Sequence, residues 1–242
     1  PLWQLHRAIA VQSWGDLALA LELYADLASR MSDSAAFQHR FGDALLASGR
    51  ADEAIPHFDS VIRLEPERPE GYVGRGGAYL NLKELEKAAA DLERAVELDA
   101  KHPLALAALG DLQGAAGDLD AALSFYDRAN DANPHDPEPL RRSARLAAAA
   151  GREEASKDRL EDLLREHPYD TEAALELSQL SFAHSRGSAR ALELAQRAHR
   201  FGGGEAAREL LVVIHRARGD TELAAHYATS EQRPGESGAD PE

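Results

Sequence analysis

The chain has 242 residues, no cysteine and a net charge of −15, and these values exclude several classes of function. A strongly acidic protein disfavours nucleic acid as its main partner, because neutralising phosphates needs a concentrated basic face. The lack of cysteine excludes disulfides, thiolate nucleophiles and cysteine-ligated zinc, and no apolar run is long enough to insert into a membrane.

A regular period runs through the sequence. The segment 103–136 holds two amphipathic helical patterns separated by Gly117, and neither helix could bury its apolar stripe alone. Each period is therefore interpreted as a helix A, a short turn and a helix B. The positions that recur at a constant interval are Gly42, Gly76 and Gly110 in helix A, and Ala20, Ala54, Ala88 and Ala122 in helix B.

This pattern resembles the tetratricopeptide repeat family, whose signature has a length of about 34 residues and the motif W-x2-L-G-x2-Y, A-x3-F, P. The resemblance implies an all-α, right-handed α-solenoid (superhelix) of about seven helix-turn-helix units over residues 1–230, held by burial between neighbouring repeats. Residues 231–242 lack a large apolar side chain and are expected to form a disordered acidic tail or linker. The units are expected to begin near Pro1, Ala35, Pro69, Pro103, Pro137, Thr171 and Glu205.

In chain order, the first five repeats keep the pattern with few departures. In the first repeat, Gly15 is expected to end helix A and Asp16 to cap helix B. In the second, Pro56 falls in the opening turns of helix B, where a small bend is the most that we expect. In the third, Lys83 stands where other repeats have glycine, and in the fifth Ser156 replaces the alanine of helix B.

The sixth repeat departs most from the pattern. Its helix B fits the periodic frame only after one extra residue around 185–188, which predicts a longer turn. Three glycines at 202–204 then replace the proline-containing connection, and glycine permits a change in stacking angle. We therefore expect this repeat to be the weakest joint of the array.

No group of residues indicates catalysis, and no cofactor or metal is expected. The segment 130–136 resembles a calcium loop but lacks the central glycine, and Arg142 stands where that loop needs a glutamate. Ser178, Ser181 and His184 share a helix face, yet no orienting acid or oxyanion hole accompanies them. The ten histidines form no metal-binding motif. The sequence thus predicts a protein that is not an enzyme.

The family resemblance also indicates where a partner would bind. In tetratricopeptide arrays, partners bind the concave face, to which helix A contributes a fixed set of positions. Many of these positions here hold small residues, which would let a partner backbone or helix approach closely. The lysine and asparagine clamp of the co-chaperone subfamily does not carry over, because no asparagine stands at the matching places. The predicted groove residues are His39, Arg40, Val73, Gly74, Gly77, Leu80, Ala107, Ala108, Asp111, Arg141, Arg142 and Arg145.

Two interpretations of the three arginines are open. In the first, they anchor an acidic group of the partner, because the planar guanidinium binds a carboxylate through two hydrogen bonds. In the second, they form an internal ladder with the chain's own acids, since Asp111 precedes Arg142 by nearly one repeat and Glu176 follows Arg145 by nearly one. Exposed pairs of this kind are common and contribute only about 0 to 1 kcal/mol.

The sequence therefore predicts a non-enzymatic adaptor or scaffold that binds a protein or peptide with apolar and acidic groups. Two alternatives are a regulatory or substrate-positioning segment of a larger enzyme and a self-assembling scaffold. The chain begins at Pro1 within a helical pattern, which leaves room for an upstream signal, anchor or domain. Leu2, Trp3, Leu5 and Ile9 are expected either to be covered by such a segment or to form a homo-oligomer.

Overall fold

The structure, a computed structural model, describes residues 2–229. Within that range it has fourteen α-helices, one short 3₁₀-helix and no strand, which confirms the all-α class and the seven helix pairs. The division into an array over 1–230 and a tail over 231–242 stays a prediction, because the tail lies outside the described residues. The helix pairs, each written as helix A then helix B, are α1 (Leu2–Ser13) and α2 (Leu17–Leu27), α3 (Ala35–Ala47) and α4 (Ala51–Leu64), α5 (Pro69–Asn81) and α6 (Leu85–Leu98), α7 (Pro103–Ala116) and α8 (Leu119–Ala132), α9 (Glu138–Ala149) and α10 (Glu153–Glu166), α11 (Thr171–His184) and α12 (Ala189–Arg200), and α13 (Gly204–Arg218) and α14 (Thr221–Thr229).

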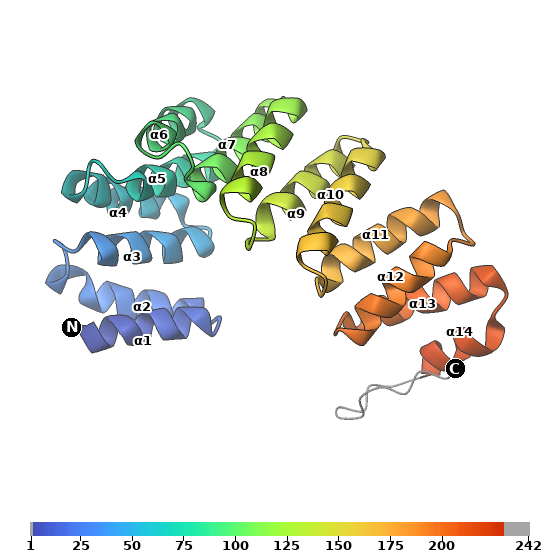
Figure 1. Cartoon of the computed structure of the whole chain (residues 1–242). Coiled ribbons are helices and arrows are strands. Elements are labelled where there is room, and N and C mark those ends of the chain that lie inside the picture. The colour runs from blue at the N-terminus through green and yellow to red at the C-terminus, as the bar shows by residue number, and fades with distance from the viewer. Residues whose placement is uncertain (1, 230–242) are drawn as a thin grey trace. The chain divides into compact units, whose positions relative to one another are not determined.

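The helices form two compact units (Figure 1). Unit 1 (Pro1–Asn133) contains α1 to α8 and the 3₁₀-helix Ala28–Arg30, and unit 2 (Pro134–Glu242) contains α9 to α14. Within each unit every helix packs on the next one in the chain, and successive A helices also touch, as α3 does α5 and α11 does α13. Burial between neighbours therefore builds each unit, as repeat arrays require. The superhelical path of the whole chain stays a prediction.

The periodic glycines of helix A have a packing role that repeats with the same geometry. A Cβ atom added to Gly42 would lie 2.8 Å from the ring of Phe58, and one added to Gly76 would lie 2.8 Å from Leu92. At Gly110 the same atom would lie 2.8 Å from Tyr126. Each of these three periodic glycines thus makes room for a large buried side chain of its own helix B, which explains why the two positions keep the same period.

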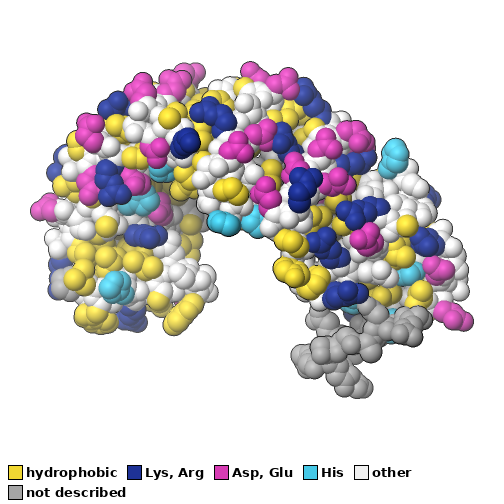
Figure 2. Space-filling model, in the orientation of Figure 1, with side chains coloured by type: hydrophobic (Ala, Val, Ile, Leu, Met, Phe, Trp, Pro, Cys, Tyr) yellow, Lys and Arg dark blue, Asp and Glu magenta, His cyan; other side chains and the backbone are white. Residues whose placement is uncertain are grey.

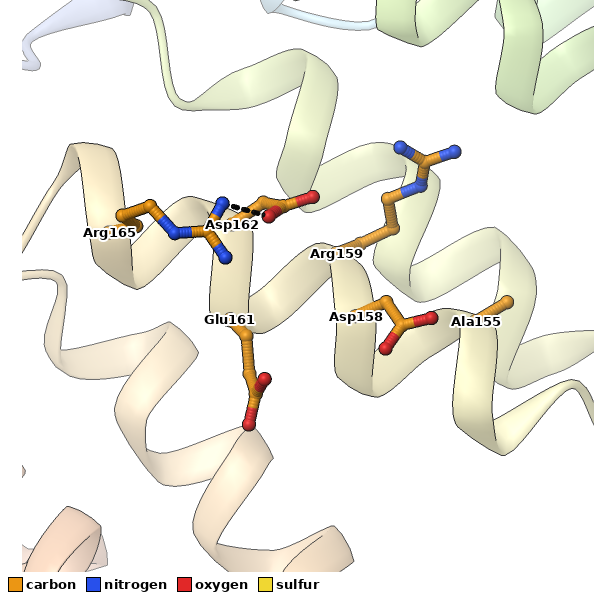
Figure 3. A pocket seen from close by; sticks show the side chains of 6 residues that line it. All are labelled: Ala155, Asp158, Arg159, Glu161, Asp162 and Arg165. Carbon is orange, nitrogen blue, oxygen red and sulfur yellow. Dashed lines mark hydrogen bonds and ion pairs between the residues drawn. The ribbon is translucent and has the colours of Figure 1, made fainter.

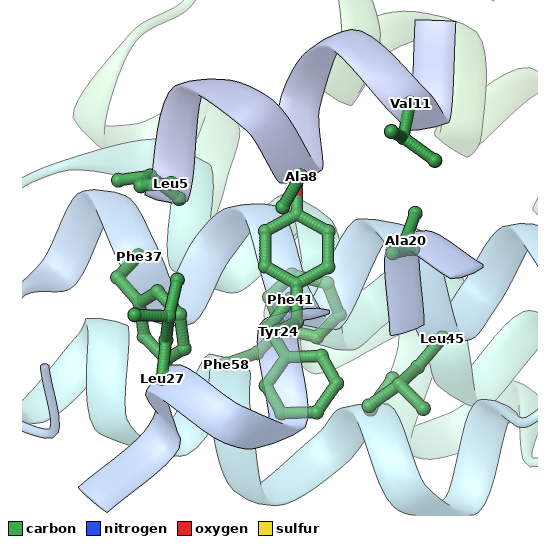
Figure 4. Packing of buried hydrophobic residues seen from close by; sticks show 12 residues of the cluster. Leu5, Ala8, Val11, Ala20, Tyr24, Leu27, Phe37, Phe41, Leu45 and Phe58 are labelled. Atoms are coloured by element: carbon green, nitrogen blue, oxygen red, sulfur yellow. The ribbon is translucent and has the colours of Figure 1, made fainter. Parts of the chain in front are cut away.

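The periodic alanines of helix B are fully buried, and large side chains fill the space around them. In unit 1, side chains of α1, α2 and α3 meet around Tyr24 and Phe58 (Figure 4). The Tyr24 ring lies 5.6 Å from Phe41 and 6.1 Å from Phe37, so helix B of the first repeat packs directly on helix A of the second. A separate core in unit 2 surrounds Leu160 and Leu194.

The helix ends follow the turn chemistry expected from the sequence. Asp16 accepts a hydrogen bond from the backbone of Leu19 at 3.1 Å, which caps α2. Gly15 adopts the left-handed backbone with φ +88°, and Lys83, which stands at the same place of the third repeat, adopts it too with φ +60°. Pro56 lies inside α4, which runs unbroken from Ala51 to Leu64.

The sixth repeat has the longer turn that the sequence predicts. Helix α11 ends at His184, and Ser188 caps α12 by accepting a hydrogen bond from the backbone of Ala191. In the following connection, Gly202 and Gly204 adopt positive φ values, while Gly203 packs so closely on Ala198 that no side chain would fit. The glycines thus have defined backbone roles, and the weak joint stays a prediction.

Candidate partner-binding surface

In unit 1, the predicted groove positions are only partly open to solvent. Val73, Gly77 and Leu80 are half-buried, whereas Ala107 and Ala108 are buried among neighbouring helices. Gly74 has no room for a side chain, because an added Cβ would overlap the Phe58 ring. The part of the predicted groove that a partner could reach is therefore smaller than the sequence suggests. Several of its small residues are used for packing between helices.

The polar groove positions of unit 1 interact with their own chain. His39 lies 3.0 Å from the carboxylate of Asp43, and its ring meets the edge of Phe58 at 5.8 Å. Asp111 accepts a hydrogen bond of 2.6 Å from the Tyr126 hydroxyl. Arg40 is exposed. The contacts of His39 and Asp111 fix these side chains of helix A before any partner arrives.

A charged network behind this face was not predicted from the sequence. Arg75 of α5 donates to both carboxylate oxygens of Asp91 in α6, at 2.8 and 2.7 Å, and to Asp59 of α4 at 2.6 Å. Asp91 is buried, and the hydrogen bonds to it raise the pKa of Arg75. Arg75 thus joins three successive helices. In the sequence it stands between glycines of helix A, and nothing in that pattern predicts an ion pair.

In unit 2, the three arginines of α9 face carboxylates of their own chain. Arg141 is only 14% exposed and donates to Glu138 and, at 2.5 Å, to Asp170 at the start of α11. Burial by itself would lower the pKa of Arg141, but the charges of Asp170 and Glu138 outweigh burial and raise it. Arg141 is therefore an internal ion-pair partner.

Arg142 and Arg145 remain more open, with 44% and 50% of their side chains exposed. Arg142 lies 3.8 Å from Glu138, and Arg145 lies 2.5 Å from Glu172 and 3.7 Å from Glu176. Burial raises the pKa of Glu176, which the charge of Arg145 opposes. The predicted pair of Arg145 and Glu176 is present, and the pair of Asp111 and Arg142, which would join the two units, stays a prediction.

The residues predicted for self-association divide between core and surface. Leu5 is buried in the core of unit 1, and Ile9 packs against that core, so neither presents an open surface. Leu2 and Trp3 are exposed. Trp14, directly after α1, is the most exposed large apolar side chain described, and it is not among the residues predicted from the sequence. The available signal was its helical spacing from Trp3, which places both tryptophans on one side of the first helix.

The described residues contain no constellation that suggests catalysis. The hollow in Figure 3 is lined by side chains of the single helix α10, where Arg165 pairs with Asp162 at 2.5 Å and Glu161 points away. Ser178 is buried and donates to the backbone oxygen of Ala191 at 2.7 Å, whereas His184 is exposed. Within residues 2–229, no cluster of three histidine or acidic side chains could hold a metal ion, and no helix could cross a membrane.

Helix pairs that recur at a fixed period and bury a B-helix side chain against an A-helix glycine define a helical repeat protein. Comparison with protein families gives the same class. One tetratricopeptide repeat profile matches residues 39–103 and 86–137, and a second matches 115–180. Together the matches run from 39 to 180, more than half of the chain. The chain belongs to the tetratricopeptide repeat family.

Several solved structures share the fold at low sequence identity. A chain of the APC/C hetero-tetramer Cut9-Hcn1 matches with a TM-score of 0.65 and 17% identity over 88% of this chain, which spans 42% of that one. PilF of Pseudomonas aeruginosa matches with a TM-score of 0.64 and 16% identity, over 81% of this chain and 89% of that one. TTC0263, a thermophilic TPR protein of Thermus thermophilus, matches with a TM-score of 0.66 and 18% identity, over 73% of this chain and 96% of that one. No curated protein matches this chain significantly.

Proposed function

We propose that this protein is a non-enzymatic interaction module that binds a peptide or helix of another protein on the face formed by its A helices. Tetratricopeptide repeats in general mediate binding between proteins, which supports the class of function. The observation that carries the finer proposal is the half-exposed pair Arg142 and Arg145 beside the exposed Ala148 and Ala149. The arginines can form an ion pair with an acidic side chain of the partner, and the small alanines let the partner's backbone lie close to the helix.

The chemistry of this α9 face indicates what the partner presents. A guanidinium has five N–H donors in a fixed fork, so an arginine that already meets Glu172 can still share donors with a second carboxylate. Small alanines let a backbone or helix lie close to α9. The proposed partner segment therefore combines small or apolar side chains with at least one Asp or Glu that contacts Arg142 or Arg145.

Unit 1 offers a second stretch of the same character. Arg40 is exposed, and Val73, Gly77 and Leu80 are half-buried on its A helices. A Cβ added at Gly77 would lie 4.0 Å from Leu46, its nearest neighbour on another helix, so this position has room for a small side chain. The same class of acidic and apolar segment suits this stretch.

A displayed library of random peptides tests the proposal with a defined probe. We expect the selected peptides to be enriched in Asp or Glu beside Ala, Leu or Val. Synthetic copies in which the acid is replaced by its amide should bind at least about tenfold more weakly, since a charge-assisted hydrogen bond contributes about 1.5 to 3 kcal/mol. Selected peptides without acids, or amide copies that bind equally well, would contradict the proposed chemistry.

A further inference from the structure

The outer face of α1 consists of Trp3, Arg7, Ala10 and Trp14, which follow one another at steps of four, three and four residues. Those steps place all four on one side of a helix. The backbone of Trp14 donates to the oxygen of Ala10 at 3.0 Å, so the helical turn reaches Trp14. Trp3 is 66% exposed and Trp14 is 84% exposed, and they are the only tryptophans of the chain. Hydrophobic side chains also gather over α1 and α2 in Figure 2.

The position equivalent to Trp3 is buried in every later repeat. Within unit 1, helix B of the preceding repeat covers it, as Tyr24 of α2 covers Phe37 and Ile62 of α4 approaches Gly71. The α1 outer face thus has the composition of one half of a helix-packing interface, and no described helix lies on it. The buried residues that follow Trp3 at the repeat interval are Phe37, Gly71, Ala105, Pro139, Ala173 and Ala207.

We propose that the α1 outer face pairs with the same face of a second copy of this chain, with the two α1 helices antiparallel about a twofold axis. The steps of four, three and four are the same in both directions, so the stripe is complementary to itself. Antiparallel pairing sets Trp3 against Trp14 of the second copy, and the aliphatic stem of Arg7 against its Ala10. A twofold interface of this kind uses one surface patch twice and closes at the dimer.

Charge favours this face over others for contact between two acidic copies. Each chain carries −15, so two copies repel each other at long range. Helix α1, with the sequence LWQLHRAIAVQS, is the only one of the described α-helices that contains no Asp or Glu. Pairing through α1 therefore brings no carboxylates of that helix together, whereas every other described α-helix carries at least one acid.

The exposed area is enough for a weak dimer. A tryptophan side chain buries on the order of 200 Å². Four partly open tryptophans and the side chains between them then give a total of about 1,000 Å², near the lower limit for specific interfaces. We expect a reversible dimer with a dissociation constant in the micromolar range, about 10⁻⁶ to 10⁻⁴ M.

Sedimentation of the chain from about 1 µM to about 500 µM tests the pairing. The mass should rise from 26.2 kDa to twice that value. Because both tryptophans lie on this face, their emission should shift to shorter wavelength along the same concentration curve. A chain that stays monomeric, or larger assemblies that never stop at a dimer, would overturn the proposal. So would a monomer whose emission is already shifted, since another surface would then cover α1.

Matched variants locate the interface. Trp14→Ser and Ala10→Glu should each remove the dimer and leave the helical circular dichroism unchanged, because Trp14 is exposed and Ala10 lies on the outer side of α1. The control is Tyr169→Ser, which removes an aromatic side chain of similar exposure, 71%, from unit 2. A dimer that survives Trp14→Ser, or one that Tyr169→Ser also removes, would contradict pairing through α1.

Cross-linking tests the antiparallel arrangement. The natural chain has no cysteine, so introduced thiols give no background. An oxidised mixture of Arg7→Cys chains and Ala10→Cys chains should form the mixed disulfide faster than either disulfide between identical chains. Preferential pairing of identical chains would indicate parallel helices and overturn the twofold geometry.

Salt separates this inference from the proposed peptide binding. Added salt screens the repulsion between two acidic chains and should strengthen the dimer. The same salt should weaken an acidic peptide on Arg142 and Arg145. Trp14→Ser should leave peptide affinity unchanged, so either proposal can fail while the other stands.

Discussion

Gly76 and Gly77 are neighbours in α5 with opposite packing. A Cβ at Gly76 would lie 2.8 Å from Leu92, whereas one at Gly77 would lie 4.0 Å from Leu46, its nearest neighbour on another helix. We predict that Gly76→Ala lowers the free energy of unfolding by about 1 to 3 kcal/mol through overpacking. Gly77→Ala, the matched control, should raise it by about 0.5 to 1 kcal/mol through helix propensity. Urea denaturation of the two variants measures both, and equal effects would contradict the packing role of the periodic glycine.

Arg75 and Asp91 form an enclosed ion pair in unit 1. We predict that Arg75→Leu destabilises the protein by on the order of 3 kcal/mol, because it leaves the buried Asp91 carboxylate without its partner. The double variant Arg75→Leu with Asp91→Leu should recover most of that loss. Thermal denaturation provides the comparison. A double variant less stable than Arg75→Leu would show that the unpaired carboxylate is not the main cost.

For single residues, the structural role could be predicted where the residue recurs from repeat to repeat, and it could not be predicted where the residue occurs only once. Gly76 and Ala88 have counterparts in neighbouring repeats, so their packing role is visible in the sequence alone. Arg75 occurs once, and its two carboxylate partners come from helices on either side in the chain. Trp14 lies at the end of a helix A. The equivalent positions of other repeats hold unrelated residues such as Ser48 and Ala116, so the repeat pattern does not predict a role for Trp14.

The turns between helix A and helix B show how one conformation is kept by different residues. Gly117 and Lys83 hold equivalent places and both have positive φ. Because a side chain disfavours that backbone, we predict that Lys83→Gly stabilises the protein by about 1 kcal/mol. The reciprocal variant Gly117→Lys, for which no atom lies within 4 Å of an added Cβ, should destabilise it by a similar amount. Chemical denaturation that finds the same sign for both would contradict this account.

Stability is predicted to vary along the array. The turn of the sixth repeat and the connection at 201–203 interrupt its regular pattern, whereas α5 to α8 keep the periodic frame. We predict faster amide exchange near α12 than in α5 to α8, because local opening needs less burial to be lost there. Hydrogen exchange followed by mass spectrometry measures both segments in one sample. Equal protection factors would show that the extra residue and the glycines create no weak joint.

At the scale of the whole molecule, the fold could be predicted from the sequence more fully than the binding surface could. The seven helix pairs can be predicted because the same pattern occurs in successive repeats, so a single departure such as Lys83 does not obscure it. The surface depends on how side chains share partners. The burial of Ala107 and the pairing of Arg141 with Asp170 come from contacts between helices, which no single repeat encodes.

The central claim is that Arg142 and Arg145 contact an acidic group of the partner. Its most direct test is a titration of a selected acidic peptide against the wild type and the Arg142→Glu, Arg145→Glu variant, with a thermal melt of each. The control is Arg165→Glu with Arg190→Glu, which changes two exposed arginines of the neighbouring B helices by the same charge. The account predicts at least about tenfold weaker binding for the first variant alone, with the fold retained. Unchanged affinity of a folded Arg142→Glu, Arg145→Glu variant would contradict it.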